Sequence, residues 1–61
     1  MPIVTLKIFP RDINTKRQLA EGITKVVAEI TKNKPESVHV IFEEISKENW
    51  SRGAELAIDR K

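Results

Sequence analysis

Two short runs of strand-forming residues flank one long amphipathic segment, and this order constrains the fold more than any other feature. Residues 3–9 and 38–45 are rich in β-branched and aromatic side chains, as strands are. Between them, over about residues 15–33, apolar side chains recur at helical spacing. A helix of this length can cross over between two parallel strands. The order therefore predicts a βαβ unit of the α+β class, with two parallel strands and one crossover helix.

Turn and capping residues indicate where these elements begin and end. Pro10 cannot donate a hydrogen bond to a central ladder, so the first strand should end there. Asp12 and Asn14 are candidate N-caps of the helix that follows. The last segment, residues 50–61, has Gly53 as a turn between short apolar patches, which predicts a small C-terminal hairpin or arm.

The size of the chain predicts one small domain, residues 1–61, that associates with copies of itself. A chain of this size buries only about 60% of its unfolded surface and usually needs disulfides, a metal or association. The sequence has no cysteine and one histidine, which excludes disulfides and the usual metal sites within one chain. Because Phe42 and Ile41 place apolar side chains on opposite faces of the second strand, one helix cannot cover both. We therefore expect a homo-oligomer.

The distribution of charge and hydropathy argues against two classes of partner. The 11 basic and 9 acidic side chains are interleaved along the chain. Nucleic-acid binders more often gather basic side chains on one face with aromatic platforms, whereas Phe9, Phe42 and Trp50 are scattered. No apolar run approaches the ~20 residues of a membrane span, and the N-terminus lacks a signal-peptide pattern. We expect a cytoplasmic protein that binds neither nucleic acid nor membranes.

Pro2 directly follows the initiator methionine and stands at the head of the first strand. Methionine is commonly removed when a small residue such as proline follows it. Removal would leave a secondary amine as the first atom of the chain, and a neutral amine in that position can act as a general base. Taken alone, Pro2 is more often an ordinary proline at the first residue of a strand.

Four other side chains are candidates to build a site around that nitrogen. Arg11 places a permanent cation in the loop after the first strand, and His39 lies in the second strand. Phe9 and the sole tryptophan, Trp50, are candidates to line the substrate site and exclude water. Singly, each is more often a solvated, partly exposed or interface residue. Together, a cation and the exclusion of water would lower the pKa of the Pro2 amine.

Four stretches of the sequence resemble the 4-oxalocrotonate tautomerase family, and the resemblance covers essentially the whole chain. They are the opening M-P-I-V-T-L-K-I, the arginine just after the first strand, S-V-H-V-I-F-E-E in the second strand, and Trp50 followed by G-A-E-L-A at residues 53–57. The resemblance implies the tautomerase fold, assembled as a homohexamer (a trimer of dimers) with active sites shared between subunits. It also implies isomerisation of enol or dienol acids such as 2-hydroxymuconate in aromatic compound catabolism, with no cofactor and no metal.

The same resemblance assigns roles to the candidate residues. Pro2 would be the general base, Arg11 would bind a substrate carboxylate, and Trp50 would exclude water. Two features depart from the family pattern: His39 stands where the family has a second catalytic arginine, and the loop before Arg11 is one residue shorter. An arginine can bind a carboxylate and a carbonyl together, whereas histidine offers one donor at a time and is not permanently charged. We expect weaker carbonyl polarisation at His39, or a different substrate.

Two alternative functions remain open from the sequence. A hydratase or dehalogenase acting on unsaturated acids would need a group that activates water, for which Glu48 and Glu55 are candidates near Trp50. A non-catalytic oligomeric protein could keep the same fold. If Met1 is retained, the Pro2 nitrogen is an amide without a lone pair for catalysis, and the enzymatic hypotheses fail.

Overall fold

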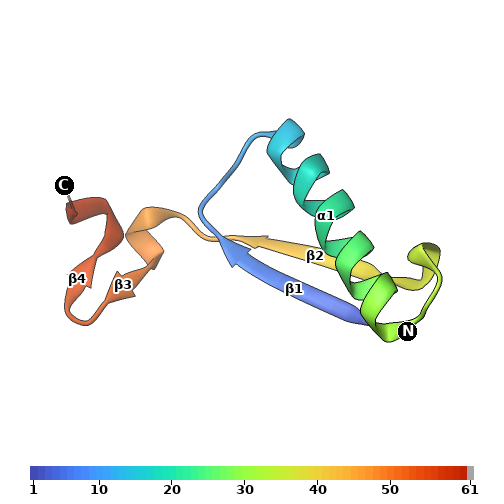
Figure 1. Ribbon diagram of the computed structural model, residues 1–61. Coiled ribbons are helices and arrows are strands. Elements are labelled where there is room, and N and C mark those ends of the chain that lie inside the picture. The colour runs from blue at the N-terminus through green and yellow to red at the C-terminus, as the bar shows by residue number, and fades with distance from the viewer. Residues whose placement is uncertain (61) are drawn as a thin grey trace.

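The computed structural model describes residues 1–60 and contains the expected strand, helix and strand (Figure 1). Strands β1 (Ile3–Ile8) and β2 (His39–Glu44) form a parallel two-stranded sheet. Helix α1 (Ile13–Thr31) connects them and lies along one face of the sheet. The βαβ architecture expected from the sequence is therefore confirmed.

The C-terminal segment forms the expected hairpin, which extends away from the βαβ unit as an arm (Figure 1). Strands β3 (Ser51–Arg52) and β4 (Glu55–Leu56) pair antiparallel across a turn at Gly53. Gly53 has φ +64°, a left-handed conformation that glycine adopts without steric cost. Short 3₁₀ helices complete the structure at Pro35–Ser37, Lys47–Asn49 and Ala57–Asp59.

The alternation of side chains along β1 decides which of them lie under the helix. The side chains of Val4, Leu6 and Ile8 are half-buried, whereas Ile3 and its alternate neighbours are exposed. Strand β2 follows the same rule, because the parallel register places Val40 beside Val4 and Phe42 beside Leu6. One face of the sheet therefore packs against α1, and the other is open.

Very little of this chain is buried. Among residues 1–60, only Ala28 and Ala57 are buried apolar residues. Ile3 on the open face of the sheet is 59% exposed, and Ile30 on the helix is 76% exposed. Large apolar side chains left in water are typical of a surface that packs against another protein. This exposure supports the expectation that the chain associates with copies of itself.

Helix α1 begins two residues earlier than the sequence pattern indicated, because Asp12 is the N-cap. The Asp12 carboxylate accepts hydrogen bonds from the backbone N–H of Thr15 at 3.2 Å and from its hydroxyl at 2.6 Å. These bonds, the hydroxyl first, hold the pKa of Asp12 below its ordinary value. Asn14, the other candidate cap, lies inside the helix. The helix ends at Thr31, two residues before the expected end, where Lys32 turns into the left-handed conformation.

Replacing Asp12 with alanine should lower the midpoint of thermal unfolding at pH 7 by a few degrees, because the first turn of α1 loses its cap. Asp12→Asn keeps a capping oxygen and should unfold close to wild type. Since the folded pKa of Asp12 lies below its ordinary 3.8, its stabilising effect is complete above that pH and is lost as pH falls through the folded pKa.

Thermal unfolding from pH 7 to pH 3, at one fixed protein concentration, measures both effects. The wild-type midpoint should fall more steeply below pH 4 than that of Asp12→Asn, which cannot titrate at this position. An alanine variant that unfolds with the wild type at pH 7 would contradict the capping role.

Candidate active site

The candidate site residues lie in two groups at opposite ends of β1. The first group is Pro2 and His39, where the two parallel strands begin. The backbone N–H of His39 donates to the carbonyl of Pro2 at 2.9 Å, and this bond fixes the start of β1 against the start of β2. Pro2 is half-buried and the His39 side chain is exposed on the open side of the sheet. The structure therefore places the backbones of Pro2 and His39 next to each other, with the His39 side chain on the open side of the sheet.

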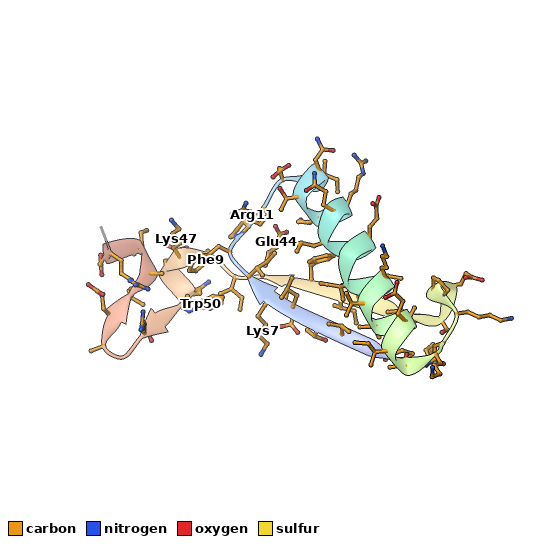
Figure 2. All side chains as sticks on the ribbon, viewed as in Figure 1. Lys7, Phe9, Arg11, Glu44, Lys47 and Trp50 are labelled. Atoms are coloured by element: carbon orange, nitrogen blue, oxygen red, sulfur yellow. The ribbon has the colours of Figure 1, made fainter. Side chains whose placement is uncertain are left out.

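The second group gathers Phe9, Arg11 and Trp50 at the other end of β1, where the arm begins (Figure 2). The ring centroids of Phe9 and Trp50 are 4.7 Å apart with their planes tilted by 55°, within the preferred range for aromatic pairs. The ammonium of Lys47 lies 5.7 Å from the centroid of the Phe9 ring, at cation–π distance. These contacts join the loop after β1 to the arm.

An open groove of about 540 Å³ runs along this second group. Its lining is mostly apolar and includes Arg11 and Trp50, whereas the side chain of Lys7 points to the open face of β1 (Figure 2). The full lining is Leu6, Lys7, Ile8, Phe9, Arg11, Thr15, Leu19 and Trp50. A largely apolar groove with a few charged groups is typical of a small-molecule site, and cations select an anion. The groove is therefore suited to a small organic acid.

Pro2 is not part of that groove. The six residues of β1 span about 16 Å at ~3.3 Å per residue, which separates Pro2 from Arg11 within one chain. Within one chain, the candidate residues around Pro2 and those around Arg11 therefore remain apart. The resemblance to the tautomerase family led us to expect sites shared between subunits, and this separation is compatible with that expectation.

Glu44, at the end of β2, contacts the Arg11 loop and was not among the residues singled out from the sequence. Its Oε2 accepts a hydrogen bond from the backbone N–H of Arg11 at 2.9 Å, and its Oε1 pairs with Nζ of Lys16 at 2.6 Å. The bond with Lys16 and then that with Arg11 lower the pKa of the Glu44 carboxyl. The sequence contains one indication of this contact. Glu44 continues the alternation of Val40 and Phe42, which places its carboxylate on the face of β2 that the helix covers.

The two glutamates considered as activators of water lie outside the groove. Glu48 belongs to the 3₁₀ helix before Trp50, and the lining of the groove does not include it. Glu55 belongs to β4, and its carboxylate lies 3.8 Å from Nε of Arg60 within the arm. The geometry of the described chain thus gives the hydratase or dehalogenase hypothesis no positional support.

Two further features of the described chain concern other possible ligands. Over residues 1–60, no three side chains of the metal-binding types His, Cys, Asp or Glu gather at one point. In the same range, no helix has both the length and the apolar character that crossing a membrane requires.

Comparison with known proteins identifies the family. A family model described as "Tautomerase enzyme" matches residues 2–60. The chain belongs to the tautomerase family. This tautomerase-family chain is 43% identical over 51 residues to the probable tautomerase BH3814 of Halalkalibacterium halodurans, covering 82% of the chain and 84% of that relative. It is also 36% identical over 52 residues to the tautomerase PptA of Cronobacter sakazakii, covering 82% of the chain and 68% of that protein.

Solved structures agree with the tautomerase fold. YwhB, a homologue of 4-oxalocrotonate tautomerase, superposes with a TM-score of 0.90 at 31% identity, covering 98% of this chain and 100% of YwhB. TomN, a 4-oxalocrotonate tautomerase homologue in the tomaymycin biosynthetic pathway, superposes with a TM-score of 0.91 at 27% identity, covering 97% of this chain and 92% of TomN. The chain is therefore a 4-oxalocrotonate tautomerase-like member of the family, and its relatives support an isomerase of the tautomerase type.

Proposed function

We propose that the protein is a cofactor-independent tautomerase that converts enol or dienol acids, such as 2-hydroxymuconate, to their keto forms. Pro2, freed by removal of Met1, is the general base. Arg11 binds a substrate carboxylate, and Phe9 and Trp50 exclude water from the groove. The observation that carries this proposal is the groove itself, which joins the Arg11 cation to an aromatic pair in a chain of the tautomerase family.

The reaction moves one proton and consumes nothing. The neutral amine of Pro2 takes the proton of the enol hydroxyl, and the O–H electron pair becomes the second bond of the carbonyl. The electrons of the carbon–carbon double bonds shift along the chain, and the ammonium of Pro2 returns the proton to the terminal carbon of the dienol. A well-placed acid–base group of this kind contributes roughly 10²–10⁴-fold to the rate.

Arg11 and the aromatic pair serve this proton transfer in two ways. A guanidinium can hold a carboxylate with two parallel hydrogen bonds, which orients the reacting carbon over the nitrogen. A nearby cation and the loss of water both disfavour the charged form of the Pro2 amine, so they lower its pKa and keep a fraction neutral. In the proposed site, the groove of one chain therefore positions the substrate and activates the Pro2 base of another chain.

A complete site requires a second chain, and the edge of β1 offers a way to provide it. In the sheet formed by residues 1–60, β1 pairs only with β2, so its other edge is free. Antiparallel pairing of β1 with β1 of a second copy would place Pro2 of each chain beside Arg11 of the other. Exposed Ile3 and Ile41 on the open face then give such dimers an apolar surface for further packing. A homohexamer built as a trimer of dimers would provide both the second chain that completes each site and a partner for this apolar surface.

Pro2→Ala should lower kcat for ketonisation of 2-hydroxymuconate by roughly 10²–10⁴-fold. The reason is that the primary, freely rotating amine of alanine replaces the secondary, ring-held amine of proline that we propose as the base. Glu21→Ala, on the exposed surface of α1 and outside both groups of candidate residues, is the control and should keep wild-type activity. Intact mass must first show that Met1 is absent from each preparation. Equal rates for Pro2→Ala and wild type, on protein of verified N-terminus, would overturn the proposal.

Mixing Pro2→Ala subunits with Arg11→Ala subunits, after reversible dissociation, should restore activity that neither variant has alone. Random pairing makes half of the dimers mixed, and each mixed dimer has one intact site of two, so about a quarter of wild-type activity is expected. The rate of ketonisation before and after mixing measures the recovery. If every site is contained in one chain, mixing recovers nothing.

His39→Arg should raise kcat for 2-hydroxymuconate several-fold, because a guanidinium is always charged and can bind a carbonyl and a carboxylate together. His39→Asn, which offers a neutral donor, should be slower than wild type if the imidazole contacts substrate. Steady-state kinetics, with the oligomer size checked by sedimentation, separates these outcomes. Identical kcat values for all three proteins would exclude His39 from the site.

A further inference from the structure

We propose that Glu44 is a positioning residue of the active site, which fixes the loop that carries Arg11. This inference rests on the proposed carboxylate-binding role of Arg11. It adds a side chain that does not touch substrate but determines where the guanidinium enters the groove. Figure 2 shows Glu44 and Arg11 close together between the end of the sheet and the first turn of α1.

Both oxygens of the Glu44 carboxylate are used, and they bind different segments. Oε2 accepts from the backbone N–H of Arg11, 33 residues away in the sequence, and Oε1 binds Nζ of Lys16, 28 residues away. One side chain at the end of β2 therefore ties together the loop after β1 and the first turn of α1. A hydrogen bond to a charged acceptor is stronger than a neutral one, so this contact is suited to holding a backbone in place.

The loop is restrained on both sides of this contact. The N–H of Ile45 donates to the carbonyl of Ile8 at 2.8 Å, which prolongs the strand pairing up to the loop. Pro10 has a fixed φ, and Asp12 is held by its capping bonds to the helix. Arg11 lies between these restraints, and the Glu44 contact removes the freedom that remains at its own backbone amide.

The contact leaves the charge of Arg11 available. Among residues 1–60, the Arg11 guanidinium makes no hydrogen bond or ion pair, because Glu44 binds its backbone and not its side-chain head. Lys16 supplies the cation that balances Glu44. The side chains of Lys16 and Glu44 are only 24% and 32% exposed, so solvent screens the pair less than a fully exposed one. The Glu44–Lys16 pair thus anchors Arg11 without competing with a substrate carboxylate.

The position of the Arg11 guanidinium must be well defined if it is to form two hydrogen bonds with a substrate carboxylate. Binding groups must be held to within about 0.5 Å and 10–20° of the productive geometry, and small misplacements of a substrate cost large factors in rate. A loop freed from Glu44 would let the Arg11 guanidinium sample positions in which only one of its hydrogen bonds forms. The expected consequence is weaker substrate binding, with a smaller effect on the proton transfer at Pro2.

The kinetic test compares Glu44→Ala and Glu44→Gln for 2-hydroxymuconate. Alanine should raise KM roughly tenfold with a smaller change in kcat, whereas glutamine keeps an acceptor for the Arg11 N–H and should restore most of the loss. Glu43→Gln, the neighbouring carboxylate on the open face of β2, is the matched control and should behave as wild type.

A double-mutant cycle separates positioning from general stability. In the Arg11→Ala background, Glu44→Ala should cause no further change in kcat/KM, because the side chain that Glu44 positions is already absent. If Glu44→Ala lowers kcat/KM by the same factor in both backgrounds, Glu44 acts through something other than Arg11, and the proposal is wrong.

Amide hydrogen exchange at Arg11 tests the same proposal without using activity. Glu44→Ala should speed exchange of the Arg11 amide severalfold, and Lys16→Met, which keeps the acceptor, should do so less. An unchanged Arg11 amide in Glu44→Ala overturns the positioning role even if the protein is a tautomerase. A failure of the proposed function would be seen in a different experiment, as equal turnover by wild type and Pro2→Ala.

Discussion

The parallel pairing of β1 with β2 is the constraint on which the remaining structure depends. Parallel strands begin at the same end of a sheet, so Pro2 meets His39 there, and the ends of both strands deliver Phe9, Arg11 and Glu44 to the other end. The crossover that such pairing needs is α1, which covers one face only. The open face of the sheet and the separation of Pro2 from Arg11 within one chain both follow from this one pairing.

The same constraint links stability to the proposed activity. Only Ala28 and Ala57 are buried among the apolar residues described, so one chain has a very small core of its own. Packing against other copies would bury the exposed isoleucines and would also bring Pro2 of one chain to the groove of another. Association then supplies both the missing core and the missing half of the site, so a variant that weakens it would lose stability and activity together.

The sequence predicted the strands, the helix and the turns, which depend on the local pattern of residues. It did not predict the helix start correctly, because that depends on which side chain makes the capping hydrogen bonds. Alternation and helical spacing located β1, α1 and β2, and Pro10 and Gly53 marked real turns. The helix start was placed two residues late, because Asp12 and Asn14 are equally good caps on paper and only the bonds from Thr15 decide between them. The rings of Phe9 and Trp50 contact each other, which the sequence did not indicate, and their exclusion of water stays a prediction.

Glu44 could not be found from the sequence alone, because its link to Arg11 depends on the register of the sheet. The register pairs Ile8 with Glu44, which brings a carboxylate beside a loop 33 residues away in the sequence. When a site is built from two chains, each chain must hold its own half rigidly before they meet. Strand pairing does so for Pro2, through the N–H of His39. Arg11 lies in a loop beyond β1, where the Glu44 carboxylate from β2 accepts the hydrogen bond of its backbone N–H, the contact to which we assign the positioning of Arg11.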